Sequence, residues 1–205
     1  MATTNPFRLV SAGWRSIVGL ALFGAILATL ASFLRPIEYA ATVRLLILQT
    51  NAGGLDPYTA LKSTERIAQN LGVLVYTSSF WNGLSQRVAL DASYFPDDEF
   101  EKREAWARAV QTGVEAGSGV MSVTAYATDR SKANALAVAA SQELVRIAPN
   151  YFGYSVRVQL IDDPLPSRFF ARPNLPIAAS AGALAGGLAG LAWVFVRRPA
   201  GERYG

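Results

Sequence analysis

Side chains with chemical potential fall in three short runs of this chain. Asp97-Asp98-Glu99 and Asp162-Asp163 are adjacent carboxylates, groups that serve as general acids and bases or as ligands of hard cations. Gly113–Gly119 is rich in glycine, but it contains Glu115 and lacks the lysine and the following helix of a phosphate-binding loop. The purely structural alternatives are a helix N-terminus for the first run, a turn after a strand for the second, and a hairpin turn for the third.

The chain contains no histidine and no cysteine. It therefore lacks the commonest general base, the commonest metal ligand and any thiolate nucleophile. A serine–lysine arrangement remains the catalytic alternative, with the lysines of the central region to choose from: Lys62, Lys102 and Lys132. We expect a protein that is not an enzyme, with no catalytic residue, no cofactor and no bound metal.

Two long apolar segments flank the central region that carries these side chains. Residues 16–34 and 175–196 carry no charge, and each is followed by arginine next to proline. At about 1.5 Å per residue, each helix would come close to the thickness of a bilayer core or exceed it. We predict two transmembrane helices. A cleaved signal peptide is the alternative for the first, because an Ala-x-Ala-like string occurs near its end.

The net charge of +4 comes from the arginines that flank these segments, whereas residues 37–172 carry 13 basic and 14 acidic side chains. Nucleic-acid binding is therefore not expected, because its basic patch should lie on the folded domain. Positive charge favours the cytoplasmic side. Arg35 is the minority at the outer end, and the arginines predicted to be cytoplasmic are Arg8, Arg15, Arg197, Arg198 and Arg203.

Small residues recur every fourth position in the second apolar segment, at Ala178, Gly182, Gly186 and Gly190. Such a stripe lets two helix backbones approach closely. We predict helix packing along it, either with the first helix or between subunits. The alternative is the ordinary abundance of glycine in membrane helices.

The region between the segments predicts an α+β domain. Strand patterns at 38–48, 120–127 and 155–161, with a hairpin over 113–128, alternate with helical patterns. The order β-α-α-α-β-β-α-β predicts a mixed β-sheet with helices on one face, in which the first and last strands pair.

These observations divide the chain into six parts. We predict a cytoplasmic N-terminal tail (1–15), a transmembrane helix (16–34), an extracytoplasmic α+β domain (35–163), a proline-rich linker (164–174), a second transmembrane helix (175–196) and a cytoplasmic C-terminal tail (197–205). The linker is expected to be a stiff spacer with polyproline character. The prolines of this region are Pro164, Pro166, Pro173 and Pro176.

Three stretches resemble a known family. They are residues 35–41, where Arg-Pro-Ile-Glu-Tyr-Ala-Ala leaves the first apolar segment; residues 123–129, a strand that ends at an aspartate before an alanine-rich helix; and residues 163–176, a proline array that enters the glycine-rich segment. Together they resemble the Wzz-type chain-length determinants, the polysaccharide co-polymerases.

The resemblance implies a homo-oligomeric scaffold of the bacterial inner membrane, with both termini cytoplasmic and the central domain periplasmic or extracellular. Its partners would be a membrane polysaccharide polymerase and a lipid-linked glycan of O-antigen, capsule or exopolysaccharide. The region between the apolar segments is short, and the chain has no fused kinase. In these respects it resembles the small form of the family, whose cytoplasmic tyrosine kinase is a separate polypeptide.

Two other functions remain open at this point. An accessory or sensor subunit would need a pocket in its outer domain, for which Tyr76, Phe80 and Trp81 are candidates. A membrane-anchored hydrolase is the third possibility, although no residue pattern specifies one.

Overall fold

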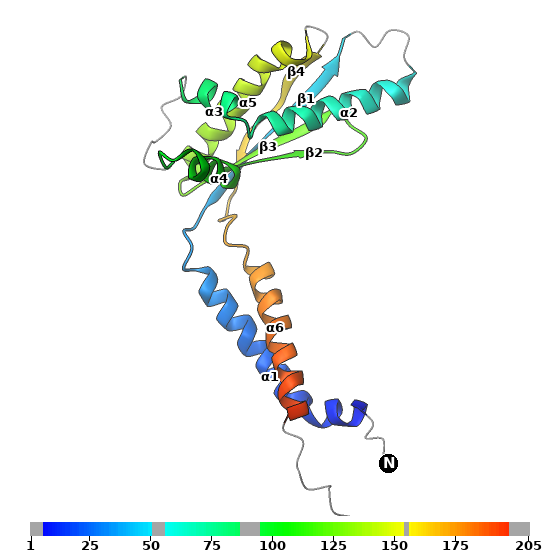
Figure 1. Ribbon diagram of the computed structural model, residues 1–205, viewed down its shortest axis with the longest axis vertical. Coiled ribbons are helices and arrows are strands. Elements are labelled where there is room, and N and C mark those ends of the chain that lie inside the picture. The colour runs from blue at the N-terminus through cyan, green and yellow to red at the C-terminus, as the bar shows by residue number, and fades with distance from the viewer. Residues whose placement is uncertain (1–5, 51–55, 87–94, 154–155, 197–205) are drawn as a thin grey trace, which may run out of the picture. The chain divides into compact units, whose positions relative to one another are not determined.

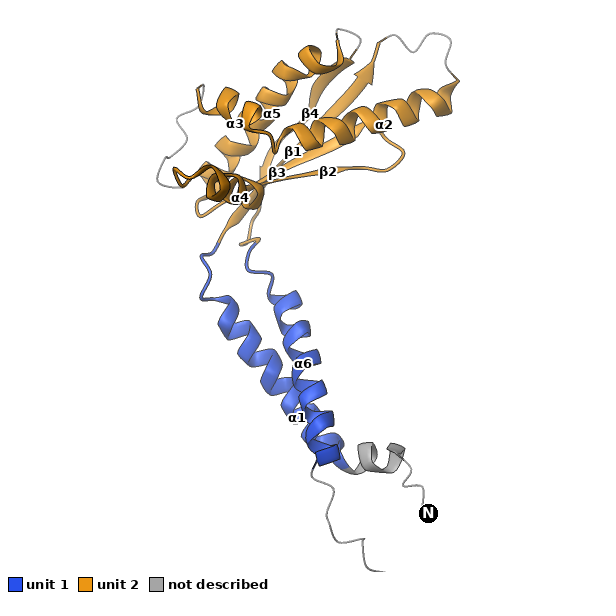
Figure 2. Cartoon of the chain, viewed as in Figure 1, with its two compact units in different colours: residues 1–37, 172–205 blue, residues 38–171 orange. Residues whose placement is uncertain are grey.

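The computed structural model describes residues 6–50, 56–86, 95–153 and 156–196, with side chains from residue 13 onward. Two compact units divide the chain: Met1–Ile37 with Arg172–Gly205, and Glu38–Ala171 (Figure 2). The predicted tails reach outside the described residues, as do the side chain of Arg8 and the three C-terminal arginines.

The first unit contains helices α1 (Pro6–Ser32) and α6 (Leu175–Val196). The bounds of α6 are those predicted, whereas α1 extends beyond Ser16 to Pro6, into the segment predicted as a tail. Two stretches, Gly13–Ser32 and Leu175–Val196, are long and apolar enough to cross a membrane. Leu175 and Pro176 open α6, where a proline costs no helical hydrogen bond.

The second unit has the predicted order of elements, which is thereby confirmed (Figure 1). Phe80, Leu84 and Val88 recur at helical spacing and predict a helix from about Ser79 to Leu90; that predicted end lies outside the described residues. The elements are β1 (Tyr39–Gln49), α2 (Pro57–Leu74), α3 (Ser78–Ser85), α4 (Glu99–Ala109), β2 (Val110–Val114), β3 (Val120–Ala127), α5 (Arg130–Phe152) and β4 (Val156–Pro166).

The α+β class is correct, but the predicted mixed sheet is wrong. The strands lie in the order β2-β3-β1-β4, and each neighbouring pair is antiparallel. Helical connections do join parallel strands here, β1 to β2 and β3 to β4. In each case another strand lies between the two, so no parallel strands are neighbours. This is the split β-α-β arrangement of the ferredoxin-like topology, with α3 and α4 added to the first crossover.

The first and last strands pair, as predicted. Their register runs from Ala41 opposite Pro166 to Gln49 opposite Val156, with irregularities on either side of Arg44. The predicted linker of residues 164–174 is therefore wrong at its start, because β4 continues through Pro164 and Pro166. Ser167 and Ala171 then donate backbone hydrogen bonds to the carbonyls of Ala40 and Glu38, both at 2.7 Å.

One face of the sheet carries the core. Alternate residues of β1, from Ala41 to Ile47, are fully buried, whereas the residues between them are partly exposed. The buried face packs against α2 and the alanine-rich side of α5. Aspartates cap the N-termini of α2, α4 and α5: Asp56, Asp98 and Asp129.

Aromatic residues extend this core beneath α3 and α4. Trp81 packs edge-on against Phe95 and Trp106, with ring centroids 4.6 Å and 5.0 Å apart. The Trp106 indole N–H donates to the carbonyl of Val75 at 2.7 Å, so this buried ring has its polar group satisfied.

Candidate functional site

The small-residue stripe of α6 lies against α1. Gly182 and Gly190 are buried, and Gly186 and Ala178 are half-buried, all on one side of α6. A Cβ added at Gly190 would lie 2.7 Å from the Ile17 Cα, and one at Gly186 would meet the Leu20 carbonyl oxygen. The backbones therefore touch at positions where only glycine fits. Of the two arrangements left open by the sequence, the structure has the stripe packed within the chain.

The matching residue on α1 is Gly24, which sequence analysis missed. A Cβ at Gly24 would collide with the Gly182 carbonyl oxygen, and a Cβ at Gly182 would collide with that of Gly24. A Cβ at Gly182 would also lie 2.5 Å from the Ala28 Cβ. Gly24 and Ala28 form a small-xxx-small pair, the pattern that could have identified this side of the interface.

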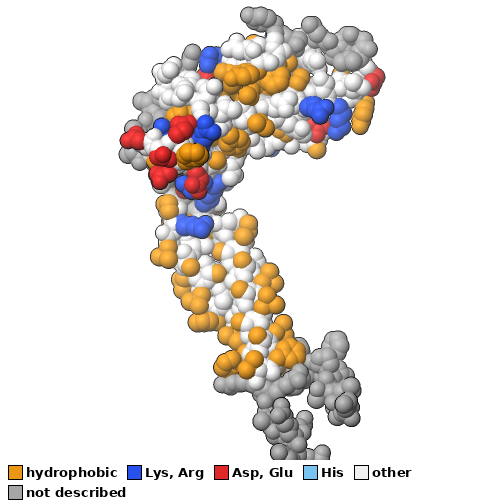
Figure 3. Space-filling model, in the orientation of Figure 1, with side chains coloured by type: hydrophobic (Ala, Val, Ile, Leu, Met, Phe, Trp, Pro, Cys, Tyr) orange, Lys and Arg blue, Asp and Glu red, His pale blue; other side chains and the backbone are white. Residues whose placement is uncertain are grey.

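The outer sides of the two helices are apolar. Leu22 and Phe23 on α1 and Leu184 and Leu188 on α6 are 58–71% exposed. Hydrophobic side chains are spread along the visible face of the pair (Figure 3). Small residues inside and large apolar residues outside suit a lipid environment, where close packing rather than hydrophobic burial holds helices together.

The four prolines of the predicted motif fall in different elements of the chain. Pro164 and Pro166 belong to the end of β4, Pro173 precedes the second helical segment, and Pro176 is exposed in the first turn of α6. Asn174 caps that helix, since its side chain accepts from the Ile177 N–H at 3.3 Å.

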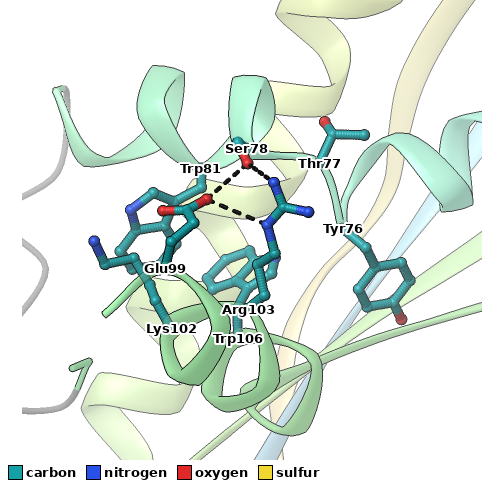
Figure 4. A pocket seen from close by; sticks show the side chains of 8 residues that line it. All are labelled: Tyr76, Thr77, Ser78, Trp81, Glu99, Lys102, Arg103 and Trp106. Carbon is teal, nitrogen blue, oxygen red and sulfur yellow. Dashed lines mark hydrogen bonds and ion pairs between the residues drawn. The ribbon is translucent and has the colours of Figure 1, made fainter. Parts of the chain in front are cut away.

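A shallow pocket lies between α3 and α4, lined in part by Tyr76, Trp81 and Trp106 (Figure 4). Phe80, the other predicted pocket residue, is 1% exposed and belongs to the core. Ser78 donates to Glu99 at 2.8 Å, and Arg103 donates to Glu99 at 3.2 Å.

These bonds lower the pKa of Glu99, the hydrogen bond from Ser78 first and that from Arg103 second. Arg103 also donates to Ser78 at 2.6 Å. The three polar groups thus satisfy one another and hold α3 to α4. Nothing in this arrangement activates the serine, because no base accepts its proton other than an already ion-paired carboxylate.

The acidic runs at residues 97–99 and 162–163 do not form a shared site. The Asp98 carboxylate accepts from the backbone N–H groups of Phe100 and Glu101 at 2.9 Å and 3.1 Å. Asp162 and Asp163 were predicted in a turn after a strand, which is wrong, because they lie within β4. Among the described residues, no three acidic side chains gather as metal ligands would.

The glycine-rich segment is the predicted hairpin. β2 and β3 pair from Val110 opposite Ala125 to Val114 opposite Met121. Gly117 has φ +70°, a conformation that glycine adopts without strain. The segment closes a turn and holds no phosphate-loop geometry.

The chain matches no protein-family model, and no curated protein matches it in sequence. The packed helix pair and the domain inserted between its helices are therefore the features from which function must be argued.

Proposed function

We propose that the chain is a non-enzymatic, oligomeric scaffold of the bacterial inner membrane that regulates the chain length, polymerisation or export of a surface polysaccharide. It crosses the membrane twice, with both termini in the cytoplasm and residues 38–171 in the periplasm. Its partners are a membrane polymerase and its lipid-linked glycan, and a separate cytoplasmic tyrosine kinase.

The observation that carries this proposal is the way the domain begins and ends. β1 and β4 pair beside each other, and Ala171 donates to Glu38, the residue that precedes β1. An insertion of this kind returns the chain to its starting point, which suits a domain held between two helices of one membrane. The motif resemblance at residues 35–41, 123–129 and 163–176 adds the link to polysaccharide.

The charge distribution supports the orientation. Arg8 and Arg15 come before the apolar part of α1, and Arg197, Arg198 and Arg203 follow α6. Positive residues close to membrane helices stay in the cytoplasm. The chain has no cysteine, so one cysteine at the 85% exposed Phe100 provides a clean test. An impermeant maleimide applied from the periplasm should label it, and labelling only after lysis would contradict the orientation.

Deletion of the gene and gel sizing of the surface polysaccharide test the function itself. We expect an altered length distribution, restored by the wild-type gene. An unchanged distribution in the deletion strain would refute the proposal. The mass of the detergent-solubilised chain tests the scaffold separately, and a strict monomer in native lipid as well as in detergent would rule it out.

A ligand-binding sensor has less support. Its natural site would be the pocket beside Trp81, but Ser78, Glu99 and Arg103 already bond to one another there. Sugar-induced change in Trp fluorescence, abolished by Trp81→Ala, would favour the sensor instead.

A further inference from the structure

The chain between β4 and α6 forms a short loop on the domain. Ser167 and Ala171 are held to Ala40 and Glu38 by backbone hydrogen bonds of 2.7 Å each, and the Ser167 hydroxyl accepts from the Ala40 N–H at 3.1 Å. Between these anchors one strand has a single residue, Tyr39, whereas the other has three. The two surplus residues make this stretch of chain project, and we call residues 168–170 the Phe169 loop.

The base of the Phe169 loop is fixed. The Arg130 guanidinium donates to the Arg168 carbonyl and lies over the Tyr39 ring, 4.8 Å from its centroid. Phe169 nevertheless remains 80% exposed, and Phe170 is 36% exposed. Two adjacent aromatic residues therefore present apolar surface on a loop whose base is held in place.

Phe169 has a cationic neighbour in the chain, because it follows the exposed Arg168. Phe100 offers a comparison, because it is 85% exposed but lies between Glu99 and Glu101. Guanidinium groups bind phosphate oxygens strongly, whereas carboxylates are repelled by them. The Phe169 loop therefore has the chemistry of a phospholipid head-group contact, and Phe100 does not.

Chain length keeps the loop near lipid. Leu175, the first residue of α6, is six residues after Phe169, a span of at most about 20 Å when fully extended. Glu38, which is bonded to Ala171, is six residues after Ser32, the last residue of α1. Both tethers end on helices apolar enough to cross a bilayer.

We propose that the Phe169 loop inserts into the head-group layer of the membrane on the domain's side. The Phe169 ring lies at the boundary with the acyl chains, and the Arg168 guanidinium binds a lipid phosphate. This inference rests on the proposed membrane span, and it adds a third membrane contact that fixes the domain against the bilayer surface.

Spin labelling tests the inference in the full chain, which has no native cysteine. Three variants, Phe169→Cys, Phe100→Cys and Leu184→Cys, are labelled with a nitroxide and reconstituted in phosphatidylcholine vesicles containing phosphatidylglycerol. Collision with oxygen reports lipid exposure, and collision with a water-soluble nickel chelate reports water exposure. Circular dichroism checks that each variant is folded.

We expect the label at 169 to show a several-fold higher ratio of oxygen to nickel collisions than the label at 100, and a lower ratio than the label at 184. Equal ratios at 169 and 100, with a lipid-exposed label at 184, would overturn the inference and leave the membrane span intact. Low collision with both reagents at 169 would also overturn it, since another protein surface would then cover the ring. A water-exposed label at 184 would overturn the span and the inference together.

Discussion

Replacing Gly186 with alanine adds one methyl group where α6 has no room for it. The new Cβ would lie 2.9 Å from the Leu20 carbonyl carbon and 3.1 Å from the Ala21 Cα. Both neighbours are backbone atoms, so they cannot turn away as a flexible side chain can. Gly187, the next residue, is the matched control, because its nearest neighbour would be the Ala21 Cβ at an ordinary 3.8 Å.

The size of the effect follows from these distances. Ordinary carbon–carbon contact is about 3.5–4.0 Å, so α6 must retreat by about 0.5–1 Å, which forfeits a quarter to a half of the dispersion energy of the contacts beside it. Overpacking of this kind costs about 1–3 kcal/mol. That cost corresponds to a shift of about 5–150-fold in the balance between packed and separated helices. Both substitutions gain the same helix propensity, so that gain cancels between them.

Pulsed electron resonance measures the outcome. Spin labels at the exposed Leu22 and Leu188 report the separation of α1 and α6 in reconstituted full-length protein. We expect Gly186→Ala to lengthen or broaden the distance distribution, and Gly187→Ala to leave it as in wild type. Identical distributions for the two variants would refute the close backbone contact, and with it the assignment of the stripe to α1.

Three further predictions concern the domain. Trp106→Phe leaves the buried Val75 carbonyl without its 2.7 Å donor. It should lower the free energy of unfolding by at least about 1–3 kcal/mol. Trp81→Phe is the control, and a smaller loss of stability for Trp106→Phe than for this control in a denaturant titration would contradict the prediction. Asp129→Ala removes the acceptor for the N–H groups of Ser131 and Lys132 and should cost about 1 kcal/mol, whereas unchanged exchange of those two amides would show that the cap contributes nothing. Ser78→Ala removes the first cause of the lowered Glu99 pKa, so NMR titration should show that pKa rising toward 4.5. Because the folded-state pKa is the lower one, the stability from Glu99 is present above pH 4.5 and lost as pH falls through the folded value. Ser78→Ala should therefore reduce this acid-induced loss of stability, and a Glu99 pKa that does not move would argue against the hydrogen bond.

Local patterns predicted most of the domain. The alternation of Ala41, Val43, Leu45 and Ile47 places a buried face on β1 whatever its neighbours are, and all four side chains are fully buried. Asp129 followed by an alanine-rich run predicts a capped helix from a few adjacent residues, and α5 begins there. Such features depend on contacts within one or two helical turns or between adjacent strands.

The errors concern relations between distant segments. Strand direction depends on β1 lying between β3 and β4, and no residue of a helical crossover specifies which strand is inserted. The prolines at 164 and 166 suggested a linker because proline lacks a backbone donor. β4 is an edge strand, however, where a missing N–H can face away from the sheet at no cost. Gly24 was missed because small residues at a spacing of four also occur at Ala21 and Ala25 in the same segment, so the Gly24–Ala28 pair does not by itself single out one face.

The position of the stripe also restricts how subunits can assemble. A glycine surface can hold only one helix backbone against it. The surface formed by Gly182, Gly186 and Gly190 already holds the backbone of α1 from the same chain. It cannot also hold a helix of a neighbouring subunit. The ring of subunits that we propose must therefore use the outer surface of the pair, where Leu184 and Leu188 are exposed, or the domain of residues 38–171. The stability of the helix pair and the number of subunits in the assembly are then separate properties. A substitution that separates α1 from α6 need not change the number of subunits. A substitution at Leu184 that changes the number of subunits need not separate the two helices.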